Sequence, residues 1–299
     1  MNNKDKSEII KILKNLVAIN SSYPPGNSTQ LNKYIFNYLK RAKLNVSLKG
    51  PHKNKLSLIA KNYNGKQKSI VFNSHIDTVQ PNKKDWITDP FTLTKKGNYL
   101  HGLGAVNCKG SAAVQMYLAS QLKNLFPNLK EKISFTFVTD EENLGPDGSF
   151  YLRKKKLINP HTLILGAPTN NNFIVEERGV FWASVYVKGK TSHAGEPHKG
   201  INAIEKANKI IYNLQTKYRI SLKKFNIHNQ LSTMNIGLMN GGHNVNVVPS
   251  NAYFQIDRRI TKKEKVDSSF QELKQFIQKY DPTAKVIFDT GTNGFSSNK

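Results

Sequence analysis

The chain alternates short apolar runs with stretches of helical periodicity, and this alternation constrains its fold more than any other feature. Apolar residues that recur every three to four positions predict helices, whereas short continuous apolar runs predict buried strands. The helical stretches are 7–18, 31–41 and 112–125, and the strand-like runs are 56–60, 69–73, 133–138 and 162–166. Strands that alternate with helices predict an α/β domain built on a mainly parallel sheet.

A different order of elements begins near Arg178–Gly179. The expected elements are a strand at 180–189, a helix at 201–218, strands at 231–239 and 252–260, a helix at 263–279 and a strand at 284–289. This βαββαβ order is that of the ferredoxin-like, or split βαβ, plan. We therefore predict an α/β domain over 1–178, a second domain over 179–290 and a short tail over 291–299.

Composition excludes some classes of protein. With 38% hydrophobic residues the chain can bury a core, and no apolar run approaches the ~20 residues that a membrane span needs. Cys108 is the one cysteine, so no internal disulfide is possible, which suits a reducing compartment. Residues 1–20 lack the apolar segment and cleavage site of a secretory signal. These features predict a cytoplasmic protein without a membrane partner.

The net charge of +25 raises the question of an anionic partner. The basic runs at 153–156, 223–224 and 262–263 are short, and aromatic residues do not alternate with basic ones as in a base-stacking surface. We interpret the charge as a solvated surface and expect no nucleic-acid partner. The alternative, nucleic-acid binding, predicts an affinity that falls steeply with salt.

The segment VFNSHIDTVQP (71–81) offers the first candidate site residues. His75 and Asp77 follow an apolar strand and share one face, because side chains in a strand alternate with period two. In open α/β sheets, ligands bind beyond the carboxyl ends of the strands. A metal-binding imidazole usually donates its other N–H group to a carboxylate, and Asp77 is placed to accept it. The alternative is an ordinary hydrogen-bonded strand end.

The segment ISFTFVTDEENLG (133–145) offers a second group of candidate site residues. Its apolar strand runs into Asp140, Glu141 and Glu142, the most acidic patch of a basic chain. Neighbouring carboxylates at a strand end point in opposite directions, so one can bind a metal while the other handles a proton. A metal-activated water and a carboxylate base are the parts needed for amide hydrolysis. The alternative is an acidic turn that caps the strand.

Several linked motifs, in this order, resemble the dinuclear-zinc amidohydrolase and peptidase family. They are HIDTVQP, DWITDPFTLTKKGNYLHGLGAVNCKG, TDEE, LGAPTN, VKGKTSHAGEPHKGINAI and GGHNVNVVPSNAYFQIDRR. The family includes acetylornithine deacetylase, succinyl-diaminopimelate desuccinylase, aminoacylases and related carboxypeptidases. The resemblance implies a zinc-binding α/β domain with an inserted ferredoxin-like lid, a homodimer formed through that lid, and zinc or cobalt as cofactor. It implies hydrolysis of small N-acyl amino acids in amino-acid biosynthesis or metabolism.

By this resemblance, His75 is a zinc ligand and Asp77 its hydrogen-bonded partner. Glu141 matches the general base that activates water, and Glu142 matches a ligand of the other zinc ion. In the lid, His193 of TSHAGEP matches a histidine that reaches a partner subunit's active site and stabilises the oxyanion.

Two further lid positions match residues that hold the carboxylate side of the substrate, Asn246 of NVNVVP and Arg259 of IDRR. The alternative for these lid residues is ordinary surface turn chemistry. The sequence does not specify which acyl group or which amino acid is bound.

The sequence departs from the family pattern in three places. Asn107 of GLGAVNCKG takes the position of the bridging aspartate, and a neutral amide lacks the charge that lets two zinc ions lie close together. Ala167 of LGAPTN takes the position of an acidic ligand, and its side chain cannot bind metal. The sequence ends at Lys299, before the segment in which the family has a glycine-rich loop and a last histidine ligand. Cys108 is a poor substitute for these ligands.

Two hypotheses follow from these matches and departures. The chain is either a metal-dependent deacylase, or a catalytically inactive, truncated family member that acts as a binding or dimerisation module. Metal uptake by the purified chain distinguishes them.

Overall fold

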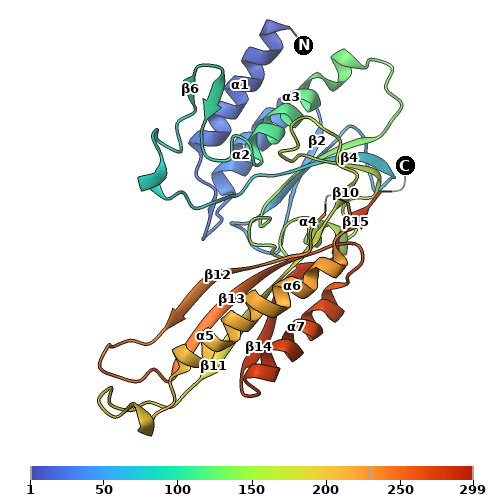
Figure 1. Ribbon diagram of the computed structural model, residues 1–299. Helices are drawn as coiled ribbons and strands as arrows, with labels where there is room; N and C mark the ends of the chain where they lie inside the picture. The colour runs from blue at the N-terminus through green and yellow to red at the C-terminus, as the bar shows by residue number, and fades with distance from the viewer. Residues whose placement is uncertain (1, 229, 298–299) are drawn as a thin grey trace. The chain divides into compact units, whose positions relative to one another are not determined.

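The chain folds into two compact units, residues 1–172 and 173–299. The computed structural model describes residues 2–228 and 230–297 (Figure 1). The units divide before the position expected from sequence, Arg178–Gly179. The reason is that strand β10 (Glu176–Glu177) pairs with β15 (Phe295–Ser296), which ties the residues just before Arg178 to the second unit.

The first unit is built on a mixed sheet with the strand order β2-β3-β8-β4-β9. Its strands are β2 (Asn45–Lys49), β3 (Ser57–Lys61), β4 (Ser69–His75), β8 (Ile133–Val138) and β9 (Pro160–Leu165). Strands β8, β4 and β9 are parallel, as the sequence predicts. Strands β2 and β3 extend this parallel part with antiparallel pairings.

Helices cover the sheet of the first unit unequally. They are α1 (Asn3–Ala18), α2 (Thr29–Arg41), α3 (Lys109–Leu125) and α4 (Ser149–Lys154). Helices α1, α2 and α3 share one core with alternate residues of β3 and β8, such as Leu58 and Phe135. The intervening residues Ile59 and Val138 pack with Leu152 of α4 instead. Alternation along each strand therefore gives the sheet two apolar faces, as expected for a strand buried on both sides.

Small elements complete this unit. They are β1 (Ser22–Tyr23) with β5 (Thr78–Val79), β6 (Thr94–Lys96) with β7 (Tyr99–His101), and a 3-10 turn at Lys83–Asp85. Helix α1 begins with a reciprocal cap, in which Asn2 and Asp5 each accept a hydrogen bond from the other's backbone N–H.

Strand β9 lies at the edge of the sheet, next to β4. All six of its residues are exposed, including the apolar Leu163, Ile164 and Leu165. Apolar residues at consecutive positions point to both faces of the sheet, a pattern typical of strands that are covered on both sides. In the described part of the chain no further strand pairs with the outer edge of β9.

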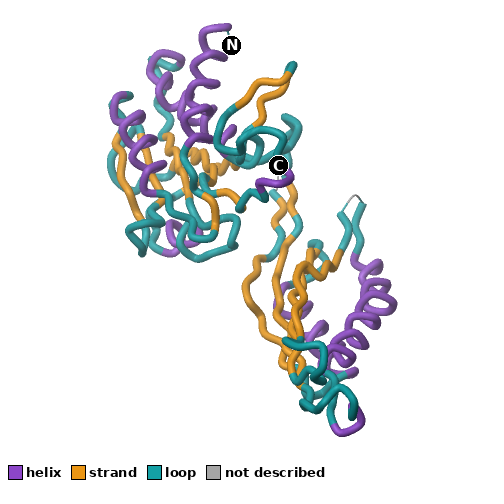
Figure 2. Tube along the Cα trace, turned by 90° about the vertical axis from the view of Figure 1, so that its left-hand side faces the viewer, coloured by secondary structure: helices purple, strands orange, loops and turns teal. Residues whose placement is uncertain are grey.

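The second unit is an antiparallel sheet with the order β12-β13-β11-β14. Its elements are β11 (Gly179–Lys188), α5 (Ala203–Asn213), a π-helical turn (Leu214–Tyr218), α6 (Arg219–Ser221), β12 (Thr233–Gly241), β13 (Asn251–Ile260), α7 (Val266–Tyr280) and β14 (Lys285–Thr292). Helices α5 and α7 cover one face of this sheet (Figure 1), and the Cα trace in Figure 2 likewise has helices on one side of these strands. The predicted ferredoxin-like βαββαβ plan is confirmed.

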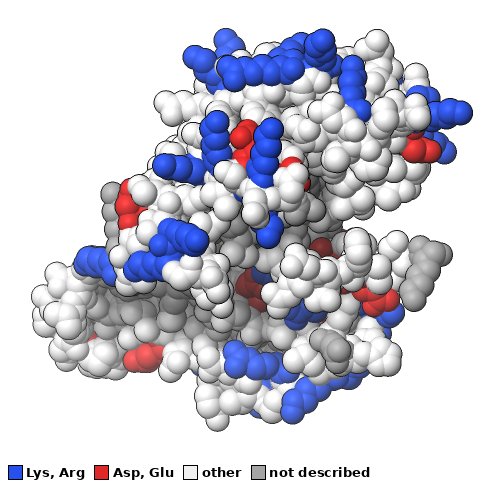
Figure 3. Space-filling view, turned by 90° about the horizontal axis from the view of Figure 1, so that it is seen from above, with Lys and Arg blue, Asp and Glu red and all other residues white. Residues whose placement is uncertain are grey.

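The distribution of charged side chains on the surface and the hydropathy of the helices bear on the partners expected from composition. Lys and Arg side chains form several separate groups on the face shown in Figure 3, with acidic side chains among them, rather than one continuous strip. Within the described residues, no helix has both the length and the apolar character needed to cross a bilayer. The absence of a nucleic-acid partner stays a prediction.

Candidate metal centre

The candidate site is formed where two parallel strands of the first unit end side by side. His75, the last residue of β4, pairs with Val138, the last residue of β8. The Ile76 N–H group donates to the Val138 carbonyl at 2.8 Å, so the pairing continues past the strand end. The loop after β8 therefore begins beside His75. Adjacent strands thus bring together residues that lie more than sixty positions apart in the sequence.

The His75 imidazole is buried, and each ring nitrogen faces oxygen atoms. Its Nδ1 lies 3.0 Å from the Asp77 carbonyl and 3.4 Å from Asp77 Oδ1, and its Nε2 lies 3.2 Å from Asn107 Oδ1 and 3.7 Å from Glu141 Oε2. Burial lowers the pKa of His75, but hydrogen bonds with Asp77 and Cys108 and the charge of Glu141 outweigh it and raise the pKa to about 11. The ring is therefore positively charged at neutral pH.

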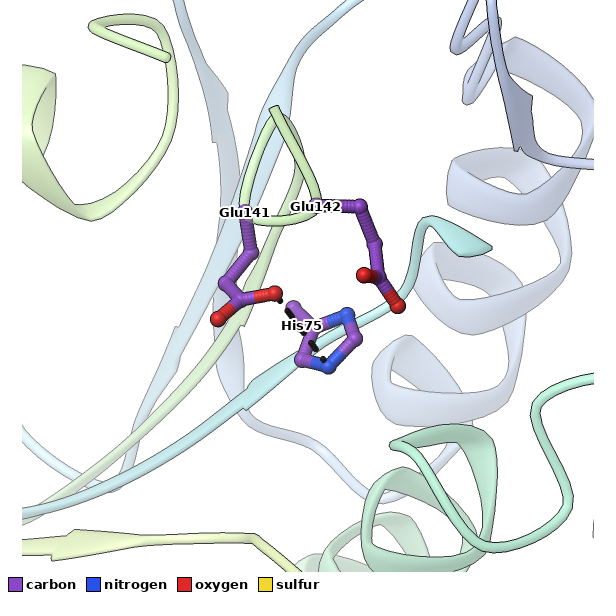
Figure 4. Close-up of side chains that lie close together, drawn as sticks. All are labelled: His75, Glu141 and Glu142. Carbon is purple, nitrogen blue, oxygen red and sulfur yellow. Dashed lines mark ion pairs between the residues drawn. The ribbon is translucent and has the colours of Figure 1, made fainter. Parts of the chain in front are cut away.

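Glu141 and Glu142 flank this imidazole from the loop after β8 (Figure 4). His75, Glu141 and Glu142 each offer a ligand atom, and these atoms all lie within 4.8 Å of one another. The Glu141 side chain is half exposed. Burial raises the pKa of Glu142, as do the charges of Glu141 and Asp77, against the opposing charge of His75. The structure thus brings together both residue pairs that the sequence predicted from separate motifs.

Asp77 connects the two strand ends. Its carboxylate is buried, with Oδ1 near His75 and Oδ2 accepting the Glu142 backbone N–H at 3.0 Å. One side chain therefore orients the imidazole and also holds the backbone of the neighbouring glutamate.

Asn107 and Ala167 stand at the two positions where the resemblance led us to expect acidic metal ligands. The Asn107 side chain faces His75 with its amide oxygen and donates to Glu142 Oε1 from its Nδ2 at 3.4 Å. It therefore links the two ligand candidates by hydrogen bonds, without adding charge. Ala167 is exposed beyond β9 and offers no donor atom. The thiol of Cys108 is buried and donates to the Gly166 carbonyl at 2.9 Å.

The three lid residues lie in the second unit, at two separate places. His193 and Asn246 are exposed and belong to adjoining loops, where Ala194 donates a backbone hydrogen bond to the Asn246 carbonyl at 3.0 Å. Arg259 stands eight residues after Asn251 along β13, a distance of roughly 26 Å at the usual rise per residue. Within this unit, the structure brings His193 and Asn246 together and leaves Arg259 apart.

Arg259 already has an anionic partner. Its guanidinium binds both carboxylate oxygens of Asp257, at 2.8 and 3.0 Å, and Trp182 Nε1 donates to the same carboxylate at 2.9 Å. A substrate carboxylate at this position has to compete with Asp257.

Sequence reasoning missed a buried lysine near the site. Lys109 is fully buried and donates to the Ile19 carbonyl at 2.8 Å. Burial lowers the pKa of Lys109 to about 8, against the opposing charge of Asp77. Lys109 follows Cys108 in a recognisable motif, but lysine is so frequent in this chain that its presence there carried no signal.

Comparisons with known proteins agree with this architecture. Residues 57–174 match the family model described as Peptidase family M28, and residues 175–285 match the Peptidase dimerisation domain. The chain is 32% identical over 247 residues to acetylornithine deacetylase of Buchnera aphidicola subsp. Schizaphis graminum, covering 79% of this chain and 64% of the relative. It is 29% identical over 209 residues to succinyl-diaminopimelate desuccinylase of Buchnera aphidicola subsp. Acyrthosiphon pisum, covering 67% of this chain and 55% of the relative.

A similar fold occurs in the crystal structure of an M20 family metallo-carboxypeptidase from Sulfolobus solfataricus. The TM-score is 0.76 at 16% identity, and the match covers 95% of this chain and 79% of that one. The two units thus have the fold of this solved structure, and the strand-end residues lie in the part of the chain that matches the peptidase family model. The chain is therefore similar in sequence to acetylornithine deacetylase and succinyl-diaminopimelate desuccinylase, and similar in fold to a solved M20 family metallo-carboxypeptidase. It spans between half and two thirds of the length of these curated relatives.

Proposed function

We propose that this chain hydrolyses the amide bond of N-acyl amino acids with the help of a divalent metal ion. The observation that carries the proposal is the cluster of His75, Glu141 and Glu142, whose ligand atoms lie within 4.8 Å of one another at a strand-end site. The names of the relatives, a deacetylase and a desuccinylase of amino-acid derivatives, support the reaction class and the substrate class. A cytoplasmic setting belongs to this proposal and is supported by the free thiol of Cys108.

The donor set fits one ion better than two. An imidazole and two carboxylates are ligands that zinc and cobalt accept, and the amide oxygen of Asn107 faces the same space. A second ion needs a charged bridge and a further acidic ligand, whereas Asn107 is neutral and Ala167 has no donor. We therefore propose a single ion, held by His75 and Glu142.

The roles of the protein groups follow from their positions. When bound, a divalent ion polarises the amide carbonyl and makes water a better nucleophile. The backbone carbonyl of Asp77 accepts a hydrogen bond from His75 Nδ1 at 3.0 Å, and its carboxylate Oδ1 lies 3.4 Å from the same nitrogen. Asp77 therefore orients the imidazole so that Nε2 would be the atom that holds an ion. Glu141, half exposed, takes a proton from the attacking water and passes it to the leaving amine nitrogen. The C–N bond breaks as the C–O bond forms, giving a carboxylic acid and a free amine.

We also propose a homodimer formed through the second unit, in which His193 of one copy serves the site of the other. The match to the Peptidase dimerisation domain and the exposure of His193 and Asn246 support this arrangement. Sedimentation analysis tests it directly, and a monomer at micromolar concentration would contradict it.

Metal loading and hydrolysis, measured on the same sample, test the proposed reaction. We expect one zinc or cobalt ion per chain by elemental analysis, and release of free amine from N-acetyl or N-succinyl amino acids. The matched control is Glu141→Gln, which keeps a similar shape but cannot accept the proton, so it should retain metal and lose at least 100-fold in rate. A folded sample that binds no metal and cleaves none of these substrates would favour the binding-module hypothesis.

A further inference from the structure

The loop that carries Glu141 and Glu142 is organised around a buried carboxylate just before them. Asp140 has a positive φ of 67°, which is uncommon for a residue with a side chain. Its Oδ2 accepts the Asp147 backbone N–H at 3.1 Å, and its backbone carbonyl accepts the Gly145 N–H at 2.9 Å. Both contacts close the loop onto Asp140. The conformation of Glu141 and Glu142 therefore depends on keeping the Asp140 carboxylate in place.

A lysine from outside the motif neutralises that carboxylate. Lys55 Nζ lies 3.2 Å from Asp140 Oδ1, and the two side chains are 19% and 1% exposed. Lys55 stands just before β3, which runs antiparallel to β8 with Leu58 opposite Phe137. The start of β3 therefore lies beside the loop that follows β8, and the pair forms between segments 85 positions apart.

Lys55 is itself held in position by several contacts. Its backbone carbonyl accepts the Thr139 hydroxyl at 3.2 Å, and its backbone N–H donates to the His52 carbonyl at 3.0 Å. Its ammonium group lies 5.1 Å from the centre of the Tyr23 ring, within the range of a cation–π contact. The His52 ring lies 3.8 Å from Asp147 at the far side of the loop. Backbone and side chain of this short segment thus contact both ends of the loop.

The charge of Lys55 matters because its surroundings are acidic. Asp77, Glu141 and Glu142 add negative charge close to Asp140, which is almost fully buried. A buried carboxylate that loses its cationic partner carries a large desolvation cost, and moving Asp140 toward water relieves this cost. Such a movement carries Glu141 and Glu142 away from His75.

We propose that Lys55 and Asp140 are positioning residues whose ion pair holds Glu141 and Glu142 against His75 and so sets the affinity for the metal ion. This inference rests on the proposed metal-dependent function. Neither residue touches the ion or the substrate, and both act through the loop.

Cobalt titration of the full chain tests the proposal, because the visible spectrum of bound Co²⁺ reports its coordination. We expect Lys55→Met to weaken cobalt affinity at least tenfold and to change the spectrum, and Lys55→Arg to restore both. In an Asp140→Asn background, Lys55→Met should change the affinity less than twofold, since the charge to be neutralised is gone. The control is Lys224→Met, which removes an exposed ion pair with Glu272 and should leave the affinity unchanged.

The proposal would be overturned if Lys55→Met left the cobalt affinity unchanged. It would also be overturned if Lys55→Met lowered the affinity equally in the wild-type chain and in the Asp140→Asn background. Amide hydrogen exchange of the metal-free chain provides a second measurement. We expect faster exchange over residues 139–148 in Lys55→Met, with the rest of the first unit unaffected. If the wild-type chain binds no cobalt, the proposed function fails, and the exchange result alone decides whether the ion pair holds the loop.

Discussion

The residues predicted for the metal centre and those predicted for the lid differ in how the fold presents them. His75 and Asp77 are 6% and 1% exposed, and their hydrogen bonds extend to the loop that carries Glu142. His193 and Asn246 are exposed, and the contact between their loops is made through the backbone. The sheet fixes the side chains at the ends of its buried strands, whereas side chains in exposed loops of the second unit are more mobile. The first unit alone should therefore determine metal affinity.

Replacing His75 tests this comparison with the largest expected effect. His75→Ala removes the nitrogen ligand of the cluster, and two carboxylates without it form a poor site for zinc or cobalt. We expect at least a 100-fold loss of cobalt affinity by equilibrium dialysis. His161→Ala, at an exposed position of β9, is the control and should bind as the wild type does. Similar affinities for the two variants would place the metal elsewhere.

Replacing Asp77 should lower the metal affinity less than replacing His75, because Asp77 acts by orienting other groups. Asp77→Asn weakens the contact to His75 Nδ1 and the acceptor for the Glu142 backbone N–H. Partners of this kind typically contribute 10- to 100-fold to metal affinity, and we expect a loss in that range by calorimetry. Asp85→Asn, at an exposed position, serves as the control. A loss as large as that of His75→Ala would indicate that Asp77 itself binds the ion.

The pH dependence of metal binding follows from the charge on His75. Because the His75 pKa is raised to about 11, the ring holds a proton at neutral pH that the metal has to displace. The apparent affinity should therefore rise with pH, about tenfold per unit between pH 6 and 8, with one proton released from His75. Calorimetry in buffers of different ionisation enthalpy counts that proton. A pH-independent affinity would show that the ring is already neutral.

Changes in the lid should leave metal affinity almost untouched. We expect His193→Ala and Asn246→Ala to bind cobalt within about twofold of the wild type, because both residues lie in exposed loops of the second unit. Their effect should instead fall on hydrolysis, which initial-rate measurements with an N-acyl amino acid detect. A tenfold loss of metal affinity in either variant would show that the lid contributes to the metal site.

Much of the fold and part of the site follow from sequence patterns. The apolar runs that end in His75 and in Asp140 identify two strands, and the polar residues at their ends indicate a shared edge. The sequence cannot show that β3 and β8 are antiparallel neighbours, and the contact between Lys55 and Asp140 depends on that pairing. The pairing of Arg259 with Asp257 is equally hidden, because it depends on side-chain conformation rather than on a motif.

Strand β9 has a consequence for self-association of the protein at different ionic strengths. Its outer edge, with which no strand of the described residues pairs, and its exposed apolar residues offer a template on which another chain can add a strand. The net charge of +25 opposes this by repulsion between molecules. Salt shortens the range of that repulsion to about 10 Å at 0.1 M, and leaves the apolar edge as attractive as before. Dilute buffers should therefore keep the chains dispersed, whereas added salt promotes their self-association.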